Sequence, residues 1–357
     1  MLIVRIPVFL LGLAIVAGTL FSAIRTFVLP RSANDPLTRI VFLILRRIFR
    51  IFARRSRPYA ERDRIMAFYA PVGLLTLPPT WLSLVLIGYM GMFWATGIEP
   101  WPRAFRVSGS SLLTLGFEPV EGLFQTILAI SEAALGLILV ALLIAYLPTM
   151  YSAFSRREAA VTMLEVRAGA PPSAVEMISR VHRLARLDRL TEVWVAWEAW
   201  FVDIEESHTS LAALVFFRSP QPDHSWVTAA GAVLDAASLV ASTVDVPRDT
   251  RADLCIRAGY LALRRISDFF RIPYDPSPAR DDPISVTRQE FDEACERLAS
   301  QGVPLKPDRE QAWRDFSGWR VNYDTVLIAL ARLTMAPEAP WSSDRALPPA
   351  RVSRLPK

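Results

Sequence analysis

Long runs of apolar residues are confined to the first 151 positions of the chain. Residues 7–29, 68–97 and 122–151 are predominantly apolar, and each is long enough for a helix that must cross the bilayer core with about 20 residues. From residue 152 onward, charged residues recur at regular intervals, as in a soluble helical protein. The pattern predicts an all-α membrane protein with three transmembrane helices and a mostly α-helical domain outside the bilayer.

The first two apolar runs carry features that qualify this prediction. The first has a single charge, Arg25, near its end and no A-x-A cleavage pattern after it, so residues 1–30 are expected to stay as an N-terminal transmembrane anchor. The second contains Pro71, Pro78 and Pro79. Because proline disrupts helix hydrogen bonding, we expect a broken or kinked entry before a helix that starts at Trp81.

The distribution of arginine orients the predicted spans. Residues 31–64 hold ten arginines and three acids, whereas residues 96–121 hold two arginines and three glutamates. Since loops rich in arginine stay in the cytoplasm, the N-terminus and the 96–121 connection are expected outside and the C-terminal half inside. The chain is therefore predicted to be a multi-pass protein of the plasma (inner) membrane.

Residues 31–67 form an arginine-rich segment on the predicted cytoplasmic side. In "IVFLILRRIFRIFARRSR" (40–57), apolar and arginine positions alternate as in a helix that lies in the membrane interface. We expect this segment to contact anionic lipid of the inner leaflet, although the same charges also serve as a plain topology signal. The lipid-facing basic residues would be Arg46, Arg47, Arg50, Arg54 and Arg55.

Residues 158–335 are predicted to be a cytoplasmic helical domain. "SAVE" (173–176) and "TRQE" (287–290) have capping-box spacing, and Gly302 is placed to close the helix that starts at the second. Residues 225–245 and 254–270 are predicted to be buried helices; the first contains Asp235 and several serines, which favours a core helix over a fourth span. Three tryptophans share one helix face and predict a core or a subunit interface: Trp194, Trp197 and Trp200. Residues 336–357, rich in proline and arginine, are predicted to be a disordered tail.

Motifs of enzymes and cofactor sites are missing from the sequence. It has no G-x-G-x-x-G, P-loop, HExxH or G-x-S-x-G motif, and Cys255 and Cys295 form no CxxC pair. "EESH" (205–208) could contribute to a metal site, but with three scattered histidines a surface or capping role is favoured. We therefore expect no enzymatic activity, no catalytic residue, no metal, no cofactor and no nucleic-acid partner.

The connection between the second and third apolar runs carries the most informative stretch, "WPRAFRVSGSSLLTLGFEP", at residues 101–119. It resembles the pore helix and filter of the single-pore-loop potassium channel superfamily (two-transmembrane/pore-loop type), whose members can read YPRA, then a serine four residues on, then TTVGYGD. The alignment needs no gap. The identical residues are Pro102, Arg103, Ala104, Ser108, Thr114 and Gly116, and the close replacements are Trp101, Leu115 and Phe117.

The resemblance implies a fold and an assembly. Residues 68–157 would form a pore domain, with an outer helix, a re-entrant pore helix and loop at 101–119, and an inner helix at 122–151. One loop per chain implies a homotetramer around a central path for monovalent cations. In the family, backbone carbonyls of the filter replace the hydration shell of the ion. The filter positions here would be Thr114, Leu115, Gly116, Phe117 and Glu118.

Departures from the family pattern imply a degenerate filter. Glu118 stands where the family has its second filter glycine, and Pro119 stands where it has an aspartate. The residues that brace the family's filter are also replaced, at Arg106, Val107, Ser110 and Phe117. We therefore expect weak selectivity, and a mouth ringed by four Glu118 carboxylates that favours cations in general.

Two residues of the third run are candidates for gating or for lining the pore. Glu132 is an ionisable residue inside a span, which makes it a functional candidate by default. Gly136 lies where this family often has a gating hinge, although glycine also allows helices to pack closely.

Three hypotheses stay open from the sequence. The first is a weakly selective cation channel with a cytoplasmic regulatory or assembly domain. The second is a non-conducting pore scaffold that positions a cytoplasmic sensor. The third is a membrane-anchored scaffold without a pore. The number of subunits separates the third from the other two.

Overall fold

The computed structural model describes residues 2–27, 35–53, 58–184 and 186–345. Within these ranges every regular element is a helix, and the only β-type pairing is one isolated bridge between Val244 and Leu305. The chain divides into two compact units, Met1–Ser152 and Ala153–Lys357, here called the N-terminal and the C-terminal unit. The expectation of an all-helical protein is confirmed.

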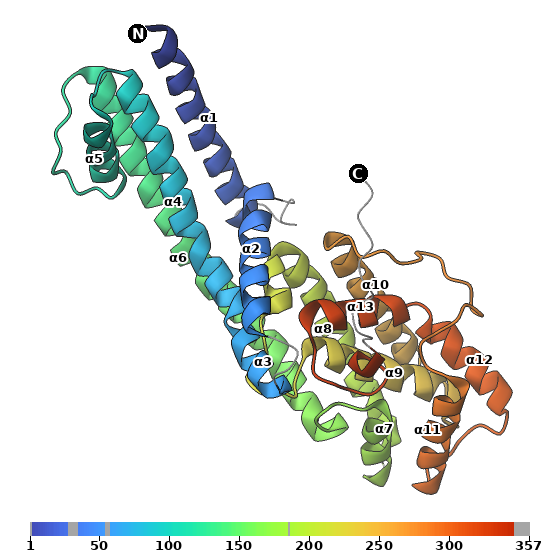
Figure 1. Cartoon of the computed structure of the whole chain (residues 1–357). Coiled ribbons are helices and arrows are strands. Elements are labelled where there is room, and N and C mark those ends of the chain that lie inside the picture. The colour runs from blue at the N-terminus through green and yellow to red at the C-terminus, as the bar shows by residue number, and fades with distance from the viewer. Residues whose placement is uncertain (1, 28–34, 54–57, 185, 346–357) are drawn as a thin grey trace. The chain divides into compact units, whose positions relative to one another are not determined.

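Six helices build the N-terminal unit, and the last continues past its end (Figure 1). The bounds are α1 Leu2–Phe27, α2 Pro36–Phe52, α3 Tyr59–Ala67, α4 Tyr69–Ala95, α5 Trp101–Leu112 and α6 Leu123–Ala168. Figure 1 shows the short helix α5 at the end of the unit where α4 ends and α6 begins. The order is therefore a long helix, a short helix and a second long helix, preceded by α1.

Glycine allows α1 and α4 to approach closely. A Cβ on Gly12 of α1 would lie 2.4 Å from the carbonyl oxygen of Gly88 in α4, and a Cβ on Gly88 would lie 2.8 Å from that of Gly12. Further along, the Trp81 indole donates a hydrogen bond to Ser22 (3.1 Å) and packs edge-on against Phe27. Contacts between small residues are how helices pack where no water drives apolar surfaces together.

Helix α4 differs from its prediction. It begins at Tyr69 and is helical through Pro78 and Pro79, whereas the sequence predicted a broken or kinked entry before Trp81. Pro71 falls in the first turn, where the missing N–H would have no helical partner in any case. The expected break was wrong because packing of α4 against α1 and α5 keeps this segment helical in spite of its prolines.

Within the described ranges, four helical segments are long and apolar enough to cross a membrane: Ile3–Phe27, Tyr59–Ala95, Leu123–Ala168 and Trp226–Thr243. The first three overlap the predicted spans 7–29, 68–97 and 122–151, of which residues 28 and 29 lie outside the described residues. The fourth is α9, and all of its residues except Ala241 are buried by other parts of the C-terminal unit. This agrees with the predicted core helix.

The C-terminal unit packs its helices around α9 (Figure 1). The further helices are α7 Ala174–Arg183, α8 Leu190–Ser210, α9 Trp226–Thr243, α10 Thr250–Phe269, α11 Arg288–Ser300, α12 Arg309–Arg320 and α13 Asp324–Thr334, with short 3₁₀ turns η1 Leu187–Arg189, η2 Ala212–Phe216 and η3 Ser343–Arg345. Trp194, Trp197 and Trp200 of α8 are buried in one core cluster, which confirms a core role for their shared face.

The predicted helix caps are present in different degrees. Thr287 and Glu290 form a full capping box at α11, and Gly302 follows that helix with φ of +82°. At α7, Ser173 accepts a hydrogen bond from the Glu176 N–H, while Glu176 itself pairs with Arg180 at 2.6 Å. The motif at 173–176 is therefore a simple N-cap and not a capping box.

Residues 336–345 contradict the expected disorder. Arg345 donates to the Glu290 carboxylate at 2.6 Å and to the backbone of Ser285, while Ala339 is buried. Arg320 also donates to the carbonyl of Trp341. The proline- and arginine-rich composition was misleading because these few residues find partners in the folded unit. The remaining tail, residues 346–357, lies outside the described residues.

His208 is also placed differently from its prediction. It is fully buried between Arg157, Ser207 and the Trp226 ring, so the surface or capping role was wrong. Burial and the neighbouring Arg157 guanidinium lower the pKa of His208 well below its usual value. The Nε2 atom faces an Arg157 nitrogen at 3.3 Å, and because a guanidinium only donates, Nε2 accepts and the ring is neutral.

Candidate functional site: the α5–α6 loop

Helix α5 is anchored at its start. Pro102 lies in its first turn, where proline fits a helix best. Trp101 stacks on Trp94 at the end of α4, with ring centroids 4.8 Å apart and planes 4° from parallel. Ala104 and Val107 are fully buried. These contacts fix α5 against α4.

Helix α5 ends in a Schellman motif. The N–H of Thr114 donates to the carbonyl of Ser111 (3.0 Å), and the N–H of Leu115 donates to the carbonyl of Ser110 (2.8 Å). Thr114 occupies the left-handed position of this motif, with φ of 55°. Glycine is usual at this position, and a β-branched residue in it is a genuine outlier.

The N–H groups of residues 114–118 all point back to α5. Besides Thr114 and Leu115, the N–H of Gly116 lies 3.5 Å from the Ser110 carbonyl. The hydroxyl oxygen of Ser110 accepts from the N–H groups of Phe117 (3.0 Å) and Glu118 (3.3 Å). One serine therefore takes up four consecutive backbone donors.

In contrast to the N–H groups, the backbone carbonyls of residues 114–117 have no hydrogen-bond partner in the described residues. The side chains of Leu115 and Phe117 are more than half exposed. The loop therefore presents four free acceptors while all its donors are satisfied internally.

Glu118 forms ion pairs within its own chain. One carboxylate oxygen lies 3.2 Å from Nε of Arg106, and the other lies 3.6 Å from Nε of Arg103. Both arginines lie in the stretch at 101–119 that resembles a pore helix and filter, but their pairing with Glu118 was not predicted. Their i, i+3 spacing, which puts them on one face of α5, was the available signal.

Glu132 is buried behind α5. Its Oε1 lies 2.5 Å from the hydroxyl of Ser108, which in turn lies 3.0 Å from the carbonyl of Leu86 in α4. The exposed fraction of Glu132 is 0%, and its Oε2 has no hydrogen-bond partner in the described residues. A residue fully enclosed within one chain cannot line a pore between chains, so the pore-lining role for Glu132 was wrong.

Gly136 faces α5 as well, one helical turn after Glu132. A Cβ at Gly136 would lie 2.2 Å from the carbonyl oxygen of Leu112, the last residue of α5. The absence of a side chain thus lets α6 lie directly against the end of α5. This geometry supports close packing as the role of Gly136, and a pore-lining role is excluded by its burial.

The opposite face of α6 is entirely apolar. Ile130, Leu137 and Ile144 form a stripe with seven-residue spacing, and each is more than 60% exposed. Between residues 127 and 147 every exposed residue of α6 is apolar. Exposure of such a surface to water is unfavourable, whereas contact with lipid or with another apolar protein surface is favourable.

Helix α2 separates an arginine face from an apolar face. Phe42 and Phe49 pack on Tyr69 of α4, and a Cβ on Gly73 would lie 2.5 Å from the Phe42 ring. Its exposed apolar residues are Ile40, Leu43, Ile44, Ile48, Ile51 and Phe52. Of the predicted lipid-facing arginines, Arg47 and Arg50 are exposed and Arg46 is partly buried. Arg54 and Arg55 lie outside the described residues.

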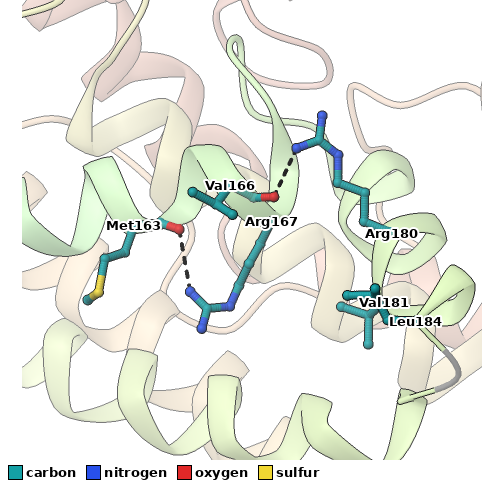
Figure 2. A pocket seen from close by; sticks show the side chains of 6 residues that line it. All are labelled: Met163, Val166, Arg167, Arg180, Val181 and Leu184. Carbon is teal, nitrogen blue, oxygen red and sulfur yellow. Dashed lines mark hydrogen bonds between the residues drawn. The ribbon is translucent and has the colours of Figure 1, made fainter.

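A shallow groove of about 350 Å³ lies in the C-terminal unit, between the end of α6 and α7. Its lining consists of Met163, Val166, Arg167, Arg180, Val181 and Leu184. Figure 2 shows the two guanidinium groups turned to different backbone carbonyls, that of Met163 for Arg167 and that of Val166 for Arg180. The groove therefore has no converging polar groups of the kind that fix a ligand.

No cluster of three or more metal-ligating side chains occurs among the residues that the structure describes. Comparison of the chain with models of protein families, with curated proteins and with solved structures finds no match. The α5–α6 loop is therefore the part of the described chain whose residues and geometry point to a function.

Proposed function

We propose that the chain is a potassium-channel-like membrane protein that assembles as a homotetramer and passes monovalent cations with weak selectivity. The four α5–α6 loops surround the path, α4 and α6 are the outer and inner helices, and α1 is an additional span. The protein lies in the plasma (inner) membrane, with its N-terminus outside and the C-terminal unit in the cytoplasm as a regulatory or assembly domain.

One observation carries this proposal. In residues 114–117 every N–H is bound to α5, and no carbonyl has a partner among the residues that the structure describes. A row of backbone carbonyls that can replace the water around a cation is the basis of filters in the channel superfamily that this stretch resembles. Irregular backbone of this kind is tolerated at membrane depth where it lines a water-filled path.

The partners of Glu118 account for weak selectivity. Arg103 and Arg106 hold its carboxylate within 3.6 Å, so each subunit adds a paired charge in place of a free one. The filter is braced by Ser110 and by this ion pair. Such bracing differs from that of the family, and we expect only modest discrimination between sodium and potassium.

Below the loop, the inner helix offers an apolar wall. If the stripe through Ile130, Leu137 and Ile144 faces the central axis, water leaves this part of the path readily and the constriction acts as a hydrophobic gate. Anionic lipid of the inner leaflet is a second partner. It would bind helix α2, where arginines lie beside exposed isoleucines.

Two measurements test the proposal. Native mass spectrometry of the full-length chain should give a tetramer, and proteoliposomes should take up both sodium and potassium. In the same assay Glu118→Gln should reduce cation uptake several-fold, because it leaves two unpaired arginines at the mouth. Glu121→Gln is the matched control, since Glu121 is exposed in the same loop. A monomer or dimer would contradict any shared pore, and folded tetramers without uptake would contradict conduction.

A non-conducting scaffold is the second candidate. The observation in its favour is the apolar surface around the loop, where Leu113, Leu115 and Phe117 are each more than half exposed. If these side chains close the centre of the tetramer, the protein positions its cytoplasmic unit as a sensor and passes no ions. Tetramers that show no uptake and no response to Glu118→Gln would support it.

A further inference from the structure

We infer that Glu132 is a neutral, protonated glutamic acid that ties α6 to α5 and thereby positions the α5–α6 loop. Its proton is held in a chain of three oxygens: the Glu132 Oε1, the Ser108 hydroxyl and the Leu86 carbonyl. The protonation state does not depend on the proposed function, whereas the consequence for ion flux does.

Counting protons along the chain of oxygens assigns the protonation state. The Ser108 hydroxyl has one proton for two contacts, 3.0 Å to the Leu86 carbonyl and 2.5 Å to Oε1 of Glu132. Because the Leu86 carbonyl can only accept, both contacts are hydrogen bonds only when the Ser108 proton goes to Leu86. The contact at 2.5 Å between Ser108 and Glu132 then needs a second proton. Only the carboxyl group of Glu132 can supply it. An O–H···O contact of this length suits a strong hydrogen bond from an acid.

Among the described residues, no cation pairs with Glu132 to balance the charge of an ionised carboxylate. Ser108 of α5 and the Leu86 carbonyl of α4 are its polar neighbours, and its second oxygen has no partner in the described residues. The nearby titratable group on α4 is Tyr89, whose hydroxyl is engaged with Ser131 at 2.8 Å. The arginines of α5 are engaged with Glu118. An unpaired charge buried in this way would be strongly unfavourable.

The position of Glu132 explains what the hydrogen bond does. Glu132 and Gly136 are four residues apart, so they share the face of α6 that meets α5. Gly136 abuts the last carbonyl of α5, while Glu132 binds Ser108 in its middle. Ser110, only two residues further along α5, holds the backbone of the loop. Glu132 is therefore a positioning residue for the loop.

Infrared difference spectroscopy of the full-length protein in lipid nanodiscs tests the protonation state. Subtracting the spectrum of Glu132→Gln from that of the parent protein at pH 7 should leave a carboxylic-acid C=O band. The difference for Glu121→Gln, an exposed acid, should contain carboxylate bands only. Carboxylate bands in the Glu132→Gln difference would overturn the inference.

A second variant covers the case in which Glu132→Gln does not fold. Ser108→Ala removes the hydrogen-bond partner and leaves the acid in place. The carboxylic-acid band should then persist and move to higher frequency, as for an acid without a hydrogen bond. An unchanged carbonyl region would overturn the inference.

The positioning role is tested by rescue. Glutamine at position 132 can still donate to Ser108 through its amide, whereas methionine has a similar size and no donor. We expect Glu132→Gln to keep the amide-exchange protection of residues 101–119 and Glu132→Met to reduce it at least tenfold. Equal protection in both variants would contradict the role. Because exchange does not measure ion flux, this outcome is distinct from failure of the proposed conduction.

Discussion

Helices α6 and α9 look alike in sequence and have opposite surroundings. Both are apolar enough to cross a membrane, and each has a buried acid within its apolar stretch, Glu132 in α6 and Asp235 in α9. In the most apolar 18-residue window, 94% of α9 is buried by the protein, against 22% of α6. Composition alone therefore does not tell a membrane helix from a core helix. The difference lies in whether the rest of its own unit covers the apolar surface.

The two acids differ as their helices do. Asp235 of α9 receives hydrogen bonds from Arg320 (2.5 Å) and Tyr323 (2.8 Å). Burial alone would lower the pKa of Arg320, but Asp235 and Asp324 raise it, so this guanidinium stays charged. Glu132 of α6 has the neutral Ser108 as its partner. In the C-terminal unit a buried charge is thus stabilised by an opposite charge, whereas the inferred state of Glu132 is a neutral, protonated acid.

The largest effect is expected from breaking the charged pair of the C-terminal unit. Arg320→Met leaves Asp235 and Asp324 buried without their cation and should lower the free energy of unfolding by about 3–5 kcal/mol. Arg265→Met is the matched control, because Arg265 is exposed and pairs with Glu205; it should cost less than about 1 kcal/mol. Denaturant titration followed by tryptophan fluorescence measures both. Equal losses would mean that burial of the pair is energetically unimportant.

The second-largest effect is expected from disrupting the packing of α5 on α6. Gly136→Ala places a methyl group 2.2 Å from the Leu112 carbonyl, so α5 must move at a cost of about 1–3 kcal/mol. Amide exchange of residues 101–119 should accelerate accordingly. Gly18→Ala is the matched control, since a Cβ on that exposed glycine of α1 meets no atom within 4 Å. Unchanged exchange in Gly136→Ala would show that α5 is not packed on α6 in the membrane.

His208 makes the stability of the C-terminal unit depend on pH. Its folded-state pKa is depressed, so below the ordinary value of 6.5 the unfolded chain binds a proton that the folded unit does not. Stability should therefore fall with falling pH, by about 1.4 kcal/mol per pH unit in this window. His208→Gln should flatten the pH dependence, whereas His182→Gln, at a partly exposed site on α7, should preserve it. A slope that persists in His208→Gln would contradict the assignment.

Local patterns predicted much of the fold. Apolar runs located α1, α4 and α6, three-residue spacing placed the α8 tryptophans in the core, and the polar residues of α9 argued against a fourth span. What failed depended on contacts between distant residues. Packing of α4 on its neighbours keeps Pro78 and Pro79 helical, and Glu290 orders Arg345, 55 positions later in the chain.

The candidate site was predicted in part. The sequence singled out residues 114–118 and Glu132. It did not reveal that Ser110 gathers the N–H groups of the loop, because that depends on how α5 ends. Nor did it reveal the partner of Glu132, since Ser108 lies 24 positions away on another helix. The directions of the loop N–H groups and the contact between Ser108 and Glu132 are set only when the chain folds.

The smallest expected effect concerns Thr114 and compares the same motif in both units. Thr114, Arg271 and Met335 each follow a helix with φ between 50° and 55°. Left-handed backbone costs a residue with a Cβ about 1–2 kcal/mol, so glycine at any of the three should raise thermal stability slightly. In the C-terminal unit nothing else should change. In Thr114→Gly the gain should be accompanied by altered sodium and potassium uptake, because Thr114 lies in the proposed path and its carbonyl would move. Unaltered uptake in folded Thr114→Gly tetramers, matching Arg271→Gly and Met335→Gly, would show that the strain at Thr114 serves only to end the helix.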